Sequence, residues 1–166
     1  MSENILIRLF EHNNWANQKI LQVCTTLSDD QLDAEPQSAT RGTIRTTLAH
    51  LASGQRGYLT LLTATAQEQY DDHLPFTTLE EVLQTSGEGL LDLVKEADHP
   101  QLQTRLRTKD GYAVEPWVVL LQAINHAGEH REQICSMLTA LGVTPPDLDG
   151  WSYGEATGAL VPVQKT

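Results

Sequence analysis

Hydrophobic side chains recur every three or four residues over four long stretches of the chain, a pattern typical of helices with one buried face. The first stretch runs from about Glu3 to Leu27 and the second from about Thr43 to Thr65. The third ends near Ala97, and the fourth runs from Pro116 to Leu141. Four helices with mostly short connections predict an all-α fold, namely an antiparallel four-helix bundle.

The third stretch carries both a start signal and two residues that weaken the prediction. Thr77-x-x-Glu80 and Thr78-x-x-Glu81 are each able to form a capping box, in which hydroxyl and carboxylate satisfy free backbone amides. Gly87 and Gly89 follow inside the stretch, and each costs about 1 kcal/mol relative to alanine in a helix. We still expect a helix here because the apolar spacing persists.

The segments on either side of the last helix add detail to the fold. Asp110-Gly111 lies between alternating polar and apolar residues within 102–114, which predicts a short hairpin or an extended loop before the last helix. Gly142 follows that helix and is a typical C-cap residue. We expect the tail from about residue 147 to pack on the bundle through Leu148, Trp151 and Tyr153, so that residues 1–166 form a single domain.

Charge and composition narrow the class of function. The 22 acidic and 11 basic residues give a net charge of -11, which argues against nucleic acid as a partner, because such binding needs a basic surface. No apolar run approaches the roughly 20 residues of a membrane span, and the N-terminus does not resemble a signal peptide. We therefore expect a cytoplasmic protein without a membrane partner, in which Cys24 and Cys135 are reduced, buried thiols.

Three histidines stand out as candidate metal ligands. His126 and His130 are four residues apart, so their side chains share one helix face with Cβ atoms about 5–6 Å apart. Two imidazoles placed in this way can also be surface residues or a satisfied core pair. Their line on the helix continues through Val119 and Ala123, which indicates an inward position and favours a metal. A third ligand must come from elsewhere, and His50 in the second helix is the candidate.

The type of metal site follows from the number and kind of its ligands. Three protein ligands leave coordination positions open, as in catalytic rather than structural zinc sites. Imidazole is a suitable ligand for several divalent metals. We expect zinc or nickel first, and iron or manganese as alternatives. Glu129 precedes His130, unlike the glutamate of the metalloprotease signature, which follows the first histidine. Cys135 lies half a turn around the helix from His126 and is not expected to join the site.

Two features near these histidines have more than one interpretation. Gly54 and Gly57 share a line with His50, which indicates either close helix packing or room for a ligand. His12 lies on an apolar line of the first helix. It is either a satisfied core histidine, which we favour, or a pocket residue.

The chain resembles the DinB family, also called DinB/YfiT-like metalloenzymes. The resemblance rests on the following segments: Trp15-Ala16-Asn17, Leu48 to Leu51 (LAHL), His126 to Ile134 (HAGEHREQI) and Leu141 to Tyr153 (LGVTPPDLDGWSY). It implies an up-down-down-up four-helix bundle, a metal site formed by His50, His126 and His130, and a homodimer. Many relatives carry glutamate five residues after the first histidine, followed by a large aromatic residue, where this chain has Gln55 and Tyr58.

The resemblance and the histidines together favour a metal-dependent enzyme that acts on small molecules. The resemblance implies a thiol-dependent S-transferase that uses a low-molecular-weight thiol, and a related hydrolase is a variant of this hypothesis. Gln55, Tyr58 and Glu129 are candidate neighbours of the metal, although none of them is an evident general base. The alternatives are a non-catalytic metal- or ligand-binding stress-response protein and a helical interaction protein whose histidines are incidental.

Overall fold

The computed structural model describes residues 4–36, 42–63, 74–96 and 98–163, and within them the protein is mostly helical. Four helices are long: α1 (Ile5–Cys24), α3 (Ile44–Thr63), α4 (Leu79–Lys95) and α5 (Pro116–Ala140). The remaining elements are short: α2 (Asp29–Leu32), η1 (Phe76–Thr78), η2 (Pro100–Leu102), β1 (Leu106–Arg107), β2 (Ala113–Val114) and α6 (Gly150–Ala156). The prediction of a predominantly helical fold agrees with this structure.

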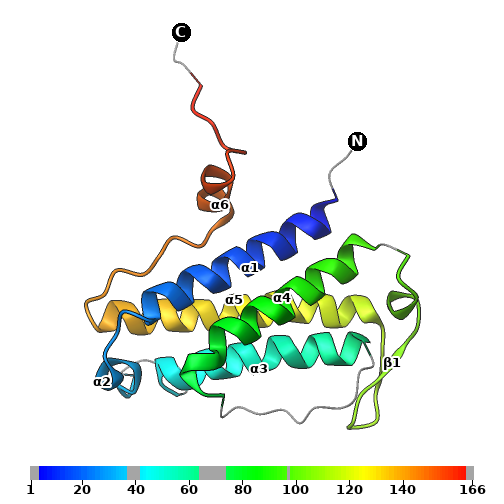
Figure 1. The fold of residues 1–166 in the computed structure, drawn as a ribbon, viewed down its shortest axis with the longest axis horizontal. Coiled ribbons are helices and arrows are strands. Elements are labelled where there is room, and N and C mark those ends of the chain that lie inside the picture. The colour runs from blue at the N-terminus through cyan, green and yellow to red at the C-terminus, as the bar shows by residue number, and fades with distance from the viewer. Residues whose placement is uncertain (1–3, 37–41, 64–73, 97, 164–166) are drawn as a thin grey trace.

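The four long helices lie side by side, and each of them packs against two others. Helix α3 contacts α4 and α5, and α1 contacts the same two helices. In Figure 1, α1 and α5 run in one direction along the molecule, whereas α3 and α4 run in the opposite direction. The two helices that carry the candidate ligands, α3 and α5, are therefore direct neighbours that run antiparallel.

The interior divides into two apolar clusters with polar side chains between them. One cluster surrounds Ile20, Leu51 and Ile134, and the other surrounds Phe10 and Leu90. On all four long helices, the chain passes from one cluster to the other through buried polar residues: Asn13, Asn17, Ser53, Gln55, Ser86, His126 and Arg131. We call this set the polar layer. Because buried polar groups need partners, this layer determines much of how the helices fit together.

The first predicted helix is shorter than expected. Helix α1 ends at Cys24 instead of Leu27, and α2 begins shortly afterwards. Ser28 caps α2: its Oγ accepts a hydrogen bond from the Gln31 amide at 3.3 Å, and Gln31 Oε1 accepts one from the Ser28 amide at 3.0 Å. This capping box interrupts the helical pattern. The predicted helix ends at Glu3, Thr65 and Ala97 lie outside the described residues.

Helix α4 begins where expected but without the predicted capping box at Thr78. The Thr78 hydroxyl donates to the Pro75 carbonyl oxygen at 2.8 Å and does not cap the helix. Gly87 and Gly89 do not interrupt α4, and each lies against a side chain of another helix. A Cβ at position 87 would lie 2.5 Å from Asn14 Oδ1 of α1, and one at position 89 would lie 2.6 Å from a Leu59 methyl carbon of α3.

The predicted hairpin and the end of the last helix are both present. Strands β1 and β2 pair antiparallel, with Leu106 opposite Val114. Gly111 in the turn has φ +93° and Gly142 after α5 has φ +72°, a conformation that favours glycine. The amide of Val143 donates to the Leu138 carbonyl at 2.9 Å and closes the end of α5.

The tail packs on the long helices through two of the three predicted residues. Leu148 contacts the first apolar cluster, and the Tyr153 ring lies 5.4 Å from both the His12 and Trp15 rings. Trp151 is 72% exposed, so the prediction was wrong for this side chain. The reason is that residues 150–156 form α6, which turns Trp151 away from the bundle.

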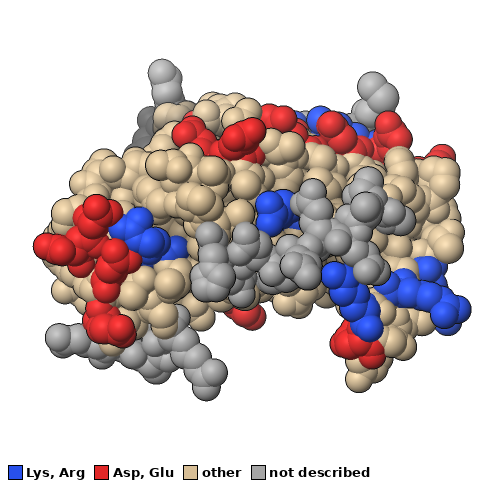
Figure 2. All heavy atoms as spheres, turned by 60° about the horizontal axis from the view of Figure 1, so that its bottom comes forward, with Lys and Arg blue, Asp and Glu red and all other residues tan. Residues whose placement is uncertain are grey.

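The charged side chains are spread unevenly over the surface. Arg45 pairs with Asp29 at 2.5 Å and with Asp33 at 2.7 Å, at the end of the bundle where α2 lies. Figure 2 shows acidic side chains around basic ones at this end, and further basic side chains at the opposite end, where the hairpin lies in Figure 1. Among the described helices, none is both long and apolar enough to cross a membrane.

Candidate metal centre

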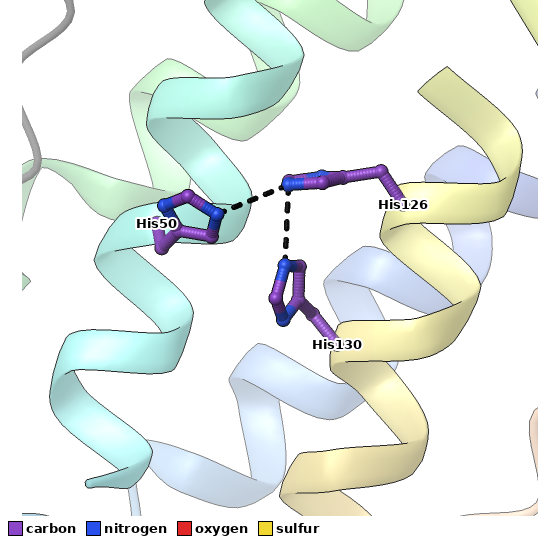
Figure 3. Close-up of side chains that lie close together, drawn as sticks. All are labelled: His50, His126 and His130. Carbon is purple, nitrogen blue, oxygen red and sulfur yellow. Dashed lines mark hydrogen bonds between the residues drawn. The ribbon is translucent and has the colours of Figure 1, made fainter. Parts of the chain in front are cut away.

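The contact between α3 and α5 brings the three predicted histidines together. His50 projects from α3, and His126 and His130 project from successive turns of α5 toward it (Figure 3). The line on α5 that was expected to be buried is buried at Val119, Ala123 and His126. His50 and His130 are half-buried. The cluster therefore lies at the edge of the core, where part of it remains accessible.

The imidazole nitrogens face one another at short distances. His126 Nε2 lies 3.2 Å from His50 Nε2 and 3.1 Å from His130 Nε2. One nitrogen from each ring lies within 4.8 Å of the other two. An imidazole nitrogen offers either one N–H or one lone pair, so His126 Nε2 makes only one directed hydrogen bond of this kind. The second contact therefore needs another source of stabilisation.

Gln133 determines which nitrogen of His130 faces the cluster. His130 Nδ1 lies 2.9 Å from Gln133 Oε1, and this oxygen only accepts hydrogen bonds, so Nδ1 is the donor. In the neutral ring the lone pair is then on Nε2, which points at His126. Metal-binding histidines usually donate their other N–H to such an acceptor, and His130 has this arrangement.

Two of the three separations in this donor set suit a divalent ion. Two nitrogens at 2.0–2.1 Å from a tetrahedral zinc ion are about 3.3 Å apart, close to the separations around His126 Nε2. A cation could also accept a lone pair from each of the three rings, whereas a ring proton joins His126 Nε2 to only one of its two neighbours by a directed hydrogen bond. The three residues come from two helices that are each 20 residues or longer, so the cluster rests on a rigid framework.

Tyr58 lies beside the cluster, as expected. Its ring is 5.5 Å from the His126 ring in an edge-on orientation. Burial raises the pKa of the Tyr58 hydroxyl, a hydrogen bond with Gln122 lowers it, and the nearby negative charge of Glu129 raises it. The net shift is upward, so the hydroxyl stays protonated at neutral pH and is able to donate a hydrogen bond. Glu129 itself is exposed and acts on Tyr58 through its charge.

Gln55 belongs to the polar layer and makes its hydrogen bonds there. Its Oε1 accepts a hydrogen bond from Asn17 Nδ2 at 2.8 Å, and its Nε2 donates to the Leu83 carbonyl and to Ser86 Oγ, both at 2.8 Å. All of these partners are on α1 and α4. The expectation that Gln55 is a neighbour of the metal is therefore not supported, because a residue five positions after His50 faces a different side of α3.

Arg131 is a buried residue that the sequence reasoning missed. Its side chain is almost fully buried, and its Nη1 donates to Asn13 Oδ1 at 2.8 Å and to Asn17 Oδ1 at 2.6 Å. Burial lowers the pKa of the guanidinium to about 10, against the opposing effects of Cys135 and Glu132. The spacing of Ala127, Arg131 and Ile134 along one buried stripe was the signal that could have found it.

The other histidines and cysteines are outside the cluster, within the part of the chain that is described. His12 Nε2 donates to the Leu148 carbonyl at 2.7 Å, so it is a satisfied histidine, as favoured from the sequence. His99 Nδ1 accepts from the Gln101 amide and caps η2. Cys135 packs against the first apolar cluster, and burial raises its pKa. Burial also raises the pKa of Cys24, to about 12. His73 lies outside the described residues.

The fold and the cluster define a helical protein in which two neighbouring helices bring three imidazoles together. The chain belongs to the DinB family, whose family model matches residues 1–165. This match confirms the resemblance that the sequence motifs indicated.

Solved structures of DinB-like proteins have a similar fold. A DinB-like protein from Bacillus cereus ATCC 10987 superposes with a TM-score of 0.67 at 18% identity, over 86% of this chain and 94% of that chain. The DinB-like protein YjoA from Bacillus subtilis gives a TM-score of 0.62 at 15% identity, over 86% of this chain and 98% of that chain. At these identities the likeness concerns the fold. No curated protein matches the chain.

Proposed function

We propose that this DinB-family protein binds one divalent metal ion through His50, His126 and His130. The observation that carries the proposal is the position of His126 Nε2, at 3.2 Å and 3.1 Å from the other two Nε2 atoms. Ring protons leave one of these contacts without a directed hydrogen bond, whereas a cation satisfies all three nitrogens. Zinc and nickel are the first metals to test, followed by iron and manganese.

We further propose that the site serves an enzyme acting on small molecules, with a low-molecular-weight thiol as one reactant. A bound ion would supply Lewis-acid chemistry, lowering the pKa of a thiol or of water. Three protein ligands leave room for such a reactant. Tyr58 would orient the second reactant, because its hydroxyl stays protonated at neutral pH and its ring lies against His126. A hydrolase that uses water in place of the thiol is the related variant.

The first experiment measures metal content in protein purified without a histidine tag from its native host. We expect about one ion per chain in the wild type, and loss of that ion in His130→Ala. Unchanged metal content in the His126→Ala, His130→Ala double variant would contradict the assignment. Because His99 caps η2 and lies outside the cluster, His99→Ala serves as the matched control and should keep the metal.

The second experiment tests turnover. Metal-loaded protein is screened for conjugation of low-molecular-weight thiols to small electrophiles and for hydrolysis of the same compounds. We expect activity that chelation removes and added metal restores, and that Tyr58→Phe lowers while the metal content stays unchanged. Stoichiometric metal without any turnover would instead support the alternative of a non-catalytic binding protein in a stress response.

We also propose the assembly in which the site operates. The single domain would be the up-down-down-up four-helix bundle that the family resemblance implies; the helix directions in Figure 1 and the contacts of α1 and α3 with α4 and α5 support this topology. Two copies would pair as a homodimer. Ile5 and Leu9, one turn apart on α1, are both exposed and support a contact there. Light scattering of the wild type and of an Ile5→Glu, Leu9→Glu variant tests the dimer, which the variant should lose.

A further inference from the structure

Five residues of the polar layer form a connected chain of hydrogen bonds that passes through all four long helices. Arg131 of α5 donates to Asn13 and Asn17 of α1, at 2.8 Å and 2.6 Å. Asn17 donates to Gln55 of α3 at 2.8 Å, and Gln55 donates to Ser86 of α4 at 2.8 Å. Each of these residues is at most 7% exposed. The chain of bonds therefore crosses the interior between the two apolar clusters.

Both helices that carry the histidines take part in this chain of bonds. Arg131 follows His130 directly on α5, and Gln55 lies five residues after His50 on α3. In a helix, the directions of side chains at fixed separations are fixed relative to one another. When Arg131 points at α1, His130 must therefore point toward α3; when Gln55 points at Asn17 and α4, His50 must point toward α5.

Apolar contacts alone specify these orientations weakly. Apolar cores tolerate repacking and lose uniqueness before they lose stability, so a helix held only by such contacts can settle in a slightly rotated position. A buried hydrogen-bond chain is less tolerant, because rotating α5 would leave the buried guanidinium and two amide oxygens without partners. The acceptors of Arg131 are amide oxygens held by α1, a helix that carries none of the three histidines.

We propose that Arg131, together with Asn13, Asn17 and Gln55, is a positioning device that fixes the rotation of α5 and α3 so that the three imidazoles converge. The inference rests on the proposed metal site and explains two motif residues, Asn17 and Arg131, that are not themselves metal ligands. Asn17 belongs to the Trp15-Ala16-Asn17 segment and Arg131 to the His126 to Ile134 segment. The two segments meet through the shortest hydrogen bond of Arg131.

The test compares Arg131→Met with a control that destabilises the fold at a distance from the layer. Leu90→Ala is the control, because Leu90 is fully buried in the second apolar cluster on α4. Each protein is stripped of metal and titrated with Co²⁺, whose visible absorption reports coordination geometry. We expect Arg131→Met to weaken Co²⁺ affinity about tenfold, as loss of outer support for ligands commonly does, and to change the spectrum. Leu90→Ala should lower the melting temperature but leave the affinity and spectrum unchanged.

Two further measurements apply if Arg131→Met does not fold or if the wild type binds no Co²⁺. If Arg131→Met does not fold, Asn13→Ala removes one of the two acceptors and should show a smaller change of the same kind, while Arg131→Lys should restore part of the affinity. A folded Arg131→Met with wild-type affinity and spectrum overturns the proposal. If the wild type takes up no Co²⁺, the proposed metal site fails instead. In that case nuclear Overhauser effects between the His50, His126 and His130 rings decide: the proposal requires them in the wild type and requires their weakening in Arg131→Met.

Discussion

His12 and the three-histidine cluster show two different ways in which this protein accommodates an imidazole. His12 donates from Nε2 to the Leu148 carbonyl at 2.7 Å and packs beside the rings of Trp15 and Tyr153. In the cluster, by contrast, ring nitrogens face other ring nitrogens at 3.1 Å and 3.2 Å. Both environments are partly buried, so burial does not separate them. The difference lies in the partner: the Leu148 carbonyl accepts one directed hydrogen bond from His12 Nε2, whereas His126 Nε2 has two ring nitrogens nearby and makes a directed hydrogen bond with only one of them.

The largest expected difference in zinc affinity is between the His50→Ala and His12→Ala variants, each of which loses one imidazole from a long helix. His50→Ala should weaken zinc binding more than about 100-fold, because loss of outer partners alone already costs 10–100-fold. His12→Ala should leave the zinc affinity within about twofold. Competition with a chromogenic chelator measures both. Equal zinc affinities in the two variants would contradict the claim that His50 is a metal ligand and His12 is not.

Removing the metal should have the next largest effect, a decrease in the melting temperature. At a free metal concentration 1,000 times the dissociation constant, binding stabilises the folded state by about 4 kcal/mol. For a chain of this length, this corresponds to a melting temperature lower by about 10 °C after chelation. Calorimetry should show this decrease in the wild type and in His12→Ala. The His126→Ala, His130→Ala variant should show no decrease, and a decrease there would place the ion elsewhere.

A smaller loss of zinc affinity is expected when Gln133, which accepts a hydrogen bond from His130, is replaced. Gln133→Leu removes the oxygen that accepts from His130 Nδ1, so the ring loses the bond that fixes its tautomer. The zinc affinity should fall about tenfold, with little change in the denaturant midpoint because Gln133 is only half-buried. Gln133→Glu keeps an acceptor and should retain the affinity. A similar loss in both variants would show that the hydrogen bond is not the cause.

The smallest effect concerns the environment of His12 itself. His12→Ala removes its bond to the Leu148 carbonyl, and a hydrogen bond of this kind contributes about 1 kcal/mol to the free energy of unfolding. Urea unfolding measures this loss. Trp151→Ala on the exposed side of α6 is the control and should change the free energy by less than about 0.5 kcal/mol. If the two variants were equally stable, the hydrogen bond between His12 and Leu148 would contribute nothing to the free energy of unfolding.

Much of the fold could be predicted from the sequence because its signals are local. The spacing of apolar residues predicted the long helices, and Asp110-Gly111 and Gly142 predicted the hairpin and the end of α5. The same periodicity concealed α2, since the pattern continues through residue 27 while Ser28 and Gln31 start a new helix. That signal was present as Ser-x-x-Gln but competed with an apparent continuation of the helix.

The candidate site was predictable in part for the same reason. His126 and His130 share a helix face by spacing alone, and apart from His12, His50 was the remaining histidine in a predicted long helix. The partners of Arg131 and Gln55 were not predictable, because they depend on how α1, α3 and α4 are rotated against one another. Spacing indicates which side of one helix a residue occupies, whereas a hydrogen bond between helices depends on the packing of both.

The two glycines of α4 have a consequence for engineering this protein. Replacing a helical glycine with alanine ordinarily raises stability by about 1 kcal/mol, and both positions would be obvious choices in a design for higher thermostability. A methyl group at position 87 would meet Asn14 of α1, and one at position 89 would meet Leu59 of α3. The Asn14 and Leu59 side chains would have to move to admit these methyl groups. The usual gain for a helical glycine would therefore be reduced at both positions, and stabilising substitutions are better sought on the exposed face of α4.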